Sequence, residues 1–216
     1  MAFCLALLTK SGIICDMSPL TQQIMDNVQA KGRGTIFSNR DFLDLGSRAA
    51  VGQALSRLVR QGSIRRIKQG LYDYPRQSQR FGALSPNLDA VALAVSNKNG
   101  NRILASGAYA ANALGLSTQV PARIVYFTDG GDRHIEVDGQ TIEFRHASPR
   151  RMAGAGKISG LVFQALRYFG NGAVDADVIA RLQSVLSDDD RRTLKQDIII
   201  APEWLRPIIR QITARV

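Results

Sequence analysis

Residues 47–75 constrain the fold most, because they combine one amphipathic helix pattern with a short basic hairpin pattern: SRAAVGQALSRLVRQGSIRRIKQGLYDYP. Ser47 is a favoured N-cap residue, and Val51, Leu55 and Leu58 recur along one face of the helix that it begins. A glycine ends this helix. The runs SIRRI and LYDYP then predict two strands, and a glycine between them permits a tight turn.

Two further helix patterns precede this segment. Ser18 and Pro19 form a cap and first-turn pair, and apolar residues then recur every four positions until a glycine. A short strand is predicted at 34–37, and SNRD at 38–41 has the form of a capping box that begins a brief second helix. The order helix, helix, helix, hairpin is typical of a winged helix-turn-helix, which we expect over residues 17–76.

Positive charge is concentrated in the same part of the chain. The formal net charge is +10, and residues 17–80 hold 11 Lys and Arg against 4 Asp and Glu, whereas residues 81–216 hold 16 against 13. A clustered basic excess is expected when counterion release from a polyanion drives binding. The alternative is that basic surface only aids solubility. The clustering favours double-stranded DNA as the partner.

The predicted third helix and the hairpin supply the candidate DNA contacts. The outward face of the helix is predicted to read or approach base edges, while flanking cations hold phosphates or the minor groove. The base-edge residues are Gln53, Ser56, Arg57 and Arg60, and the phosphate or minor-groove residues are Arg48, Arg65, Arg66 and Lys68. Alternation along a strand places Arg65 and Arg66 on opposite faces, so they cannot both make the same kind of contact. For any single residue, an ordinary solvated face is the alternative.

A second part of the chain follows a polar linker at 77–87. Residues 88–216 predict a helix, a strand and a small-residue helix, then three strands at 122–127, 133–137 and 140–146, and helices from 157 onward. The Asp138-Gly139 pair between the last two strands is a hairpin signal. The predicted fold class is therefore α+β, with an N-terminal winged helix-turn-helix followed by a small mixed sheet and a helical C-terminus.

Residues 1–16 are predicted to be a disordered extension or a mis-called start, with Met17 as the true initiator. The segment lacks a basic region before its apolar run and has no small-residue cleavage pattern, so it is not a typical signal peptide. Both cysteines, Cys4 and Cys15, lie within it, which offers neither a disulfide framework nor a four-ligand zinc site. We expect a cytoplasmic protein that spans no membrane.

Catalytic patterns are weak. AGAGKIS at 153–159 fails the phosphate-loop pattern at both ends and is better explained as small residues before a helix, although nearby Arg150 and Arg151 could hold an anion there. His134 and His146 lie on neighbouring predicted strands and could be interpreted as a metal or acid–base site, but two histidines without a third ligand are more often surface residues. We therefore expect no enzyme, no metal and no cofactor.

Longer stretches carry a family resemblance. FSNRDFLDLGSRAAVGQALSRLVRQGSIRRIKQGLYDYP, SGAYAANALGLSTQVPARIVYFTDG and FRHASPRRMAGAG resemble the AbiEi-like antitoxins, the regulator half of bacterial type IV toxin-antitoxin loci. The resemblance covers nearly the whole chain from Met17. It implies an autorepressor whose winged helix binds inverted repeats near its own promoter, as a possible homodimer.

The resemblance also implies that the C-terminal domain over 88–216 counters a nucleotidyltransferase-like toxin. In such systems the antitoxin and the toxin form no stable complex, so DNA is the expected physical partner. Three alternatives remain open at this point. One is an orphan DNA-binding regulator without a toxin, and another is an enzyme that a winged helix targets to nucleic acid. The third is a winged helix that binds another protein, which the basic charge of the segment disfavours.

Overall fold

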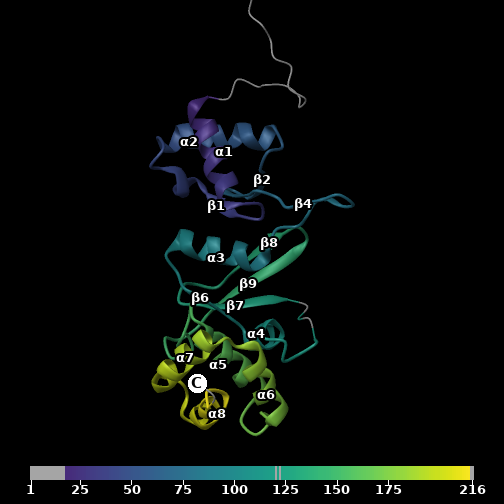
Figure 1. Ribbon diagram of the computed structural model, residues 1–216. Helices are drawn as coiled ribbons and strands as arrows, with labels where there is room; N and C mark the ends of the chain where they lie inside the picture. The colour runs from purple at the N-terminus through teal and green to yellow at the C-terminus, as the bar shows by residue number, and fades with distance from the viewer. Residues whose placement is uncertain (1–17, 120, 122, 215–216) are drawn as a thin grey trace, which may run out of the picture.

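A computed structural model describes residues 18–119, 121 and 123–214, so the prediction for residues 1–16 and both cysteines lie outside the described residues. The N-terminal unit, residues 18–76, consists of helices that pack over a small sheet (Figure 1). Its elements are α1 (Pro19–Lys31), β1 (Ile36–Ser38), the 3₁₀ helix η1 (Asn39–Phe42), α2 (Arg48–Arg60), β2 (Arg65–Lys68) and β3 (Leu71–Asp73).

The helix starts in this unit follow the predicted caps. The side chains of Ser18 and Ser47 accept hydrogen bonds from backbone N–H groups in the first turns of α1 and α2. Ser38 and Asp41 form the predicted capping box, but the helix that they begin is a single 3₁₀ turn. Its Phe42 is buried against Phe37 in edge-to-face contact. The prediction of three helical segments is therefore confirmed, with the second one shorter than an α-helix.

The strands β1, β3 and β2 form an antiparallel sheet in that order. One face of the sheet, with Phe37 and Tyr72, packs on the helices of the N-terminal unit. The opposite face, with Ile36 and Leu71, packs on the core of the C-terminal region. This division follows from the alternation of side chains along a strand. Strands β1 and β3 thus contribute to both cores, and the sheet joins the N-terminal unit to the rest of the chain.

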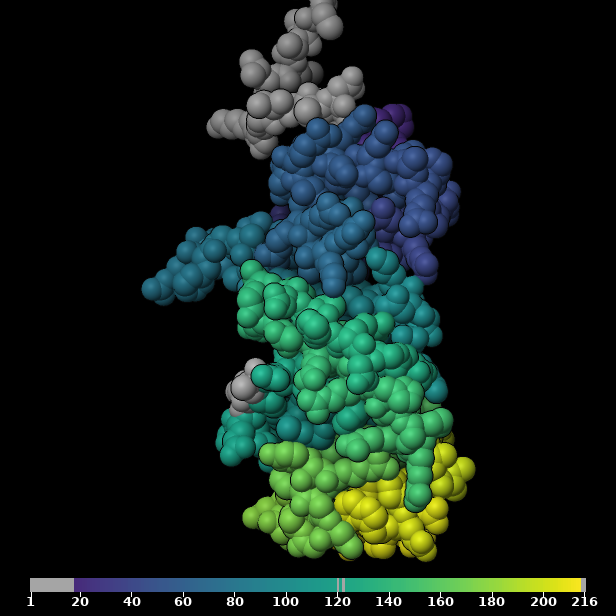
Figure 2. Space-filling view, turned by 180° about the vertical axis from the view of Figure 1, so that it is seen from behind, coloured from purple at the N-terminus to yellow at the C-terminus, as the bar shows by residue number. Residues whose placement is uncertain are grey.

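The predicted linker at 77–87 contains a small hairpin. Gln77–Ser78 (β4) pairs antiparallel with Gly82–Ala83 (β5). Figure 2 shows this hairpin projecting from the side of the molecule, and Phe81 at its tip is 73% exposed. Strands of two residues are too short to show an alternating pattern, which explains why the sequence indicates only a polar connection here.

Helix α3 (Leu88–Asn99) lies between the N-terminal sheet and a second sheet (Figure 1). The second sheet has the order β6, β7, β9, β8, with β7 and β9 parallel and the other pairs antiparallel. Its strands are β6 (Ile103–Ala105), β7 (Ile124–Thr128), β8 (Arg133–Val137) and β9 (Gln140–His146). Asp138 and Gly139 both have positive φ, 53° and 78°, as the predicted two-residue hairpin requires.

A hydrogen-bond cluster attaches the first turn of α3 to this second sheet. The Tyr109 hydroxyl donates to Asp89 Oδ1 at 2.6 Å, and the Tyr126 hydroxyl donates to the same oxygen. Burial, followed by the hydrogen bond to Asp89, raises the pKa of Tyr109 to about 12 and also raises the pKa of Tyr126. The neutral phenols are therefore the forms that the folded protein stabilises.

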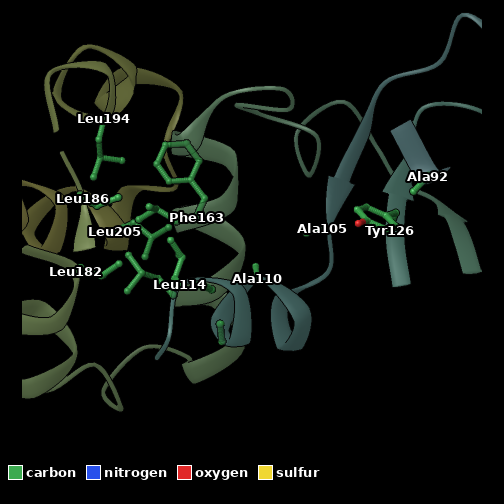
Figure 3. Close-up of a cluster of buried hydrophobic side chains, with 14 of the residues drawn as sticks. Ala92, Ala105, Ala110, Leu114, Tyr126, Phe163, Leu182, Leu186, Leu194 and Leu205 are labelled. Carbon is green, nitrogen blue, oxygen red and sulfur yellow. The ribbon is translucent and has the colours of Figure 1, made fainter. Parts of the chain in front are cut away.

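The C-terminal helices pack around an apolar core below the sheet. They are α4 (Gly107–Ala113), α5 (Ile158–Phe169), α6 (Ala176–Val185), α7 (Asp188–Gln196), η2 (Asp197–Ile200), η3 (Glu203–Leu205) and α8 (Arg206–Ile212). Phe163, Leu182, Leu194 and Leu205 are fully buried and gather between these helices (Figure 3). At Gly107 an added Cβ would lie 3.0 Å from the Gln164 carbonyl oxygen, so glycine permits the close approach of α4 to α5.

The observed fold is a mixed α+β fold with several small sheets, as the sequence predicts at this level. Within the described part of the chain, no helix has both the length and the apolar character that crossing a bilayer requires.

Candidate nucleic-acid interface

An open groove of about 1030 Å³ lies between the outward face of α2, the hairpin β2–β3 and the C-terminal end of α3. We call it the basic groove, because seven of its lining residues are cations and none is a carboxylate. The cations are Arg40, Arg48, Arg57, Arg60, Arg66, Lys68 and Lys98. The remaining lining residues are Ser38, Asn39, Leu43, Ala49, Gly52, Gln53, Ser56, Gln69, Gly70 and Tyr72.

Seven of the eight predicted contact residues line this groove. Gln53, Ser56, Arg57 and Arg60 come from α2, together with Arg48 from its first turn, and Arg66 and Lys68 come from β2. Val51, Leu55 and Leu58, on the opposite side of α2, are buried in the core of the N-terminal unit. The hydrophobic face of the helix thus fixes which residues face outward.

The groove cations are mostly unpaired. The side chains of Arg48, Arg57, Arg60, Arg66 and Lys68 form neither an ion pair nor a hydrogen bond with any residue that the structure describes. Like charges held together without counter-charges repel one another and attract an anion. The groove therefore presents a positive surface that an anionic partner can neutralise.

Arg65 is the one predicted contact residue that does not line the groove. Its guanidinium donates to both carboxylate oxygens of Asp73, at 3.0 and 2.7 Å, and also to the Leu84 carbonyl oxygen at 2.9 Å. Asp73 is 1% exposed, and the hydrogen bond that it accepts raises the pKa of Arg65. Arg65 and Arg66 point to opposite faces of the hairpin, as strand alternation predicts. Arg65 holds the hairpin to the segment that follows it.

Two groove cations, Arg40 and Lys98, were not predicted as contacts. Arg40 Nη1 donates to the Lys98 carbonyl oxygen at 2.7 Å, and Lys98 Nζ donates to the Gln69 carbonyl oxygen at 3.3 Å. Asn39 lies beside them, and its Oδ1 atom is buried without a partner among the described residues. The basic composition of 17–80 gives a signal for Arg40. Lys98 has no local signal, because only the docking of α3 brings it to the groove.

Glycine lies at two points of the groove wall. Gly70 has φ +70°, which allows the tight turn of the β2–β3 hairpin. Gly52 lies within α2, where glycine destabilises a helix by about 1 kcal/mol relative to alanine. An added Cβ at Gly52 would meet only Asn39 Nδ2, at an ordinary contact distance of 3.8 Å. Packing inside the protein therefore does not require this glycine, whereas a partner entering the groove could approach its backbone closely.

The two histidines do not form one site. His134 pairs with Glu143 in the β8–β9 register, whereas His146 has the same strand parity as Phe144 and lies at the end of β9. Side-chain alternation therefore places the histidines on opposite faces of the sheet. His146 Nδ1 is 3.0 Å from the Gly130 carbonyl oxygen. Among residues 18–119, 121 and 123–214, no cluster of three or more His, Cys, Asp or Glu side chains could hold a metal ion.

The AGAGKIS segment is a packing element before α5. Lys157 Nζ donates to Asp197 at 3.0 Å, and Ser159 Oγ donates to the same carboxylate at 2.8 Å. An added Cβ at Gly160 would lie 2.3 Å from the Gly154 carbonyl oxygen, so these glycines allow two backbone segments to touch. Its lysine is thus held by an internal carboxylate, in agreement with the interpretation as small residues before a helix.

The chain belongs to DUF6088, a family of unknown function whose model matches residues 23–194. No curated protein matches the sequence at a significant level. Among solved structures, a crystal structure of the RV2827C protein from Mycobacterium tuberculosis is similar with 13% sequence identity and a TM-score of 0.42, and the match covers 96% of this chain and 80% of that chain.

Proposed function

We propose that this protein is a sequence-specific double-stranded DNA-binding regulator whose N-terminal unit is a winged helix-turn-helix. The observation that carries the proposal is the basic groove, where the outward face of α2 lies beside a cationic hairpin with no carboxylate in the lining. An α-helix fits the major groove of DNA, which is about 12 Å wide. The hairpin cations then lie at the flanking backbone or minor groove. The protein would act in the cytoplasm, where its operator is found.

The groove residues divide into two kinds of contact. Gln53 can pair with adenine and Arg57 with guanine, while Ser56 and Gly52 allow close approach of α2 to the bases. Arg48, Arg66 and Lys68 lie around this centre and suit phosphate contacts, which position a protein without reading sequence. Arg40 and Lys98 extend the phosphate-binding surface toward the C-terminal region.

The first test is binding of the purified protein to DNA from upstream of its own gene and to a shuffled duplex of equal length and composition, at two salt concentrations. A preference of about a thousandfold for the upstream DNA would support specific regulation. Each phosphate contact contributes about −0.9 to the slope of log affinity against log salt, so five contacts predict a slope of about −4.5. Equal affinity for both duplexes would contradict a sequence-specific regulator.

Two substitutions separate the roles of helix and hairpin. Gln53→Ala should reduce discrimination at one base position by about 1–3 kcal/mol, while Lys68→Ala should weaken all duplexes alike and reduce the salt slope by about 1. If both variants weakened every duplex equally, α2 would not be the helix that reads bases.

We extend the proposal to an autorepressor that binds inverted repeats as a homodimer and acts as the antitoxin of a type IV system. The support is the resemblance of the chain to AbiEi-like antitoxins. The functional partner would be a nucleotidyltransferase-like toxin that forms no stable complex with this chain. The test is growth of cells that express the neighbouring gene with and without this protein. Rescue by the full chain but not by residues 17–87 would support an antitoxin role for the C-terminal region.

Growth that is unaffected by the neighbouring gene would favour an orphan regulator instead. The alternative of a nucleic-acid-targeted enzyme has no such support in the geometry, since His134 and His146 lie on opposite faces of the sheet. If alanine at both histidines abolished a cellular phenotype while DNA binding was retained, the enzyme alternative would gain the support that it now lacks.

A further inference from the structure

Three arginines of the C-terminal region, Arg150, Arg151 and Arg167, lie close enough to interact electrostatically. An open hollow of about 590 Å³ is lined by Arg150, Arg167, Pro202, Glu203 and Trp204, and we call it the arginine hollow. Arg150 follows β9, Arg167 lies in the last turn of α5, and the other three residues belong to the η3 segment. Three segments that are distant in the sequence thus meet around one hollow.

The neighbouring Arg151 adds a third guanidinium. Its charged group lies 4.2 Å from the centre of the Phe127 ring, and its backbone carbonyl oxygen accepts a hydrogen bond from Gln164 at 2.9 Å. These contacts hold the turn that carries Arg150 and Arg151 against α5. Burial, followed by the charges of Arg151 and Arg150, lowers the pKa of Arg167. The three cations are therefore close enough to repel one another.

No carboxylate among the described residues forms an ion pair with any of these three arginines. Glu203 lines the hollow but makes no ion pair there. Arg150, Arg167 and Glu203 line the hollow, and the adjacent Arg151 brings the local net charge to about +2, which matches a phosphate monoester carrying about −1.5 to −2 near pH 7. Arginine also suits phosphate geometrically, because its planar fork donates two parallel hydrogen bonds.

Trp204 gives the hollow an aromatic wall beside the guanidiniums. An indole ring stacks on the planar base of a nucleotide, and base–aromatic stacking contributes about 1–3 kcal/mol. A phosphate-binding cluster and a stacking surface at one hollow are the two features that a nucleotide requires.

We propose that the arginine hollow binds a small nucleoside monophosphate, with the phosphate on Arg150, Arg151 and Arg167 and the base against Trp204. This site lies apart from the basic groove and does not depend on DNA binding. The helix N-terminus at Lys157 is not part of it, because Lys157 is paired with Asp197.

Binding at this site can be followed by the fluorescence of Trp204, because Trp204 is the only tryptophan in the sequence. The full chain is titrated with adenosine monophosphate, adenosine and inorganic phosphate, with excitation at the red edge of the indole band, where adenine does not absorb. We expect the monophosphate to quench Trp204, phosphate to compete with it, and adenosine to require at least about tenfold higher concentration, because it lacks the charged group. Equal quenching by adenosine, or no quenching by the monophosphate, would overturn the proposal.

The matched variants each lose two exposed arginines. Arg150→Ala/Arg151→Ala should weaken the monophosphate response by at least about tenfold, whereas Arg102→Ala/Arg145→Ala, which removes two ion-paired arginines from the same region, should leave it unchanged. If the Arg150→Ala/Arg151→Ala variant bound the monophosphate with the same affinity as the wild type, the proposal would also be overturned.

A groove variant separates this result from DNA binding. Arg57→Ala/Lys68→Ala should lose DNA affinity and keep the monophosphate response. If the nucleotide experiment fails while the wild type binds its upstream DNA, only the arginine hollow is refuted.

Discussion

The N-terminal unit and the C-terminal region hold their surface arginines in different ways. In the C-terminal region, several exposed arginines are paired with nearby carboxylates, as in Arg102–Asp129, Arg145–Glu143 and Arg192–Asp189, and the arginines of the arginine hollow are an exception. In the basic groove, the described cations face no carboxylate in the lining. Net charge alone therefore understates how differently the two surfaces attract an anion. A paired arginine contributes little to the electrostatic potential at the surface, whereas the potentials of the unpaired groove cations add together.

Arg65 and Arg66 give the sharpest test of this difference, since they are neighbours in one strand. Arg65→Ala would leave the buried Asp73 without its partner, so we expect a loss of about 3 kcal/mol in the free energy of unfolding. Arg66→Ala should change stability by less than about 0.5 kcal/mol and weaken DNA binding instead. Urea denaturation and DNA titration of both variants measure the two effects.

The comparison would fail if Arg66→Ala destabilised the fold as much as Arg65→Ala. Such a loss would mean that the Arg66 side chain makes a stabilising contact within the protein, in contrast to its unpaired position in the groove. Equal DNA affinities of the Arg66→Ala variant and the wild type would remove Arg66 from the interface.

At Gly52, one substitution should change the stability of the protein and its DNA affinity in opposite directions. Gly52→Ala should stabilise α2 by up to about 1 kcal/mol, because the added methyl group meets only Asn39 at an ordinary distance. The same methyl group should weaken DNA binding if the helix backbone approaches the bases. Thermal denaturation and DNA titration check the two signs. A variant that is more stable and binds equally well would show that the partner does not approach α2 closely at this turn.

Tyr109 tests how the C-terminal region holds α3. Its pKa is raised from 10.0 to about 12, so the folded state favours the neutral phenol, and this contribution is complete below pH 10 and is lost as the pH rises toward 12. The wild-type melting temperature should therefore fall more between pH 9 and pH 11 than that of Tyr109→Phe, which has no hydroxyl to ionise. Tyr126 is present in both proteins, so the difference reports the Tyr109 hydroxyl together with its effect on Tyr126. Parallel pH profiles would contradict this account of the α3 attachment.

Local signals in the sequence predict most of the N-terminal unit. Ser47 and the apolar spacing of Val51, Leu55 and Leu58 define α2 and its outward face, and strand alternation already separates Arg65 from Arg66. These features depend on residues within a few positions of one another, so a sequence reveals them directly.

The parts that were missed depend on long-range packing. Lys98 reaches the groove because α3 packs under the N-terminal sheet, where Ile36 and Leu71 face the C-terminal core. The arginine hollow likewise needs Arg150, Arg167 and Trp204 to meet from three separate segments. No local pattern encodes such a meeting, because it is determined by how whole elements dock.

The smallest expected effect comes from a paired arginine in the C-terminal region. Arg192 lies on α7 with its side chain 58% exposed and forms an i, i+3 ion pair with Asp189. Exposed pairs of this kind are screened by solvent and contribute little to stability, so Arg192→Ala should leave the midpoint of urea denaturation nearly unchanged. It removes the same formal charge as Arg66→Ala. If only the local arrangement of charge matters, its DNA affinity and salt slope should equal those of the wild type, and a loss as large as that of Arg66→Ala would mean that net charge, instead of the groove, governs binding.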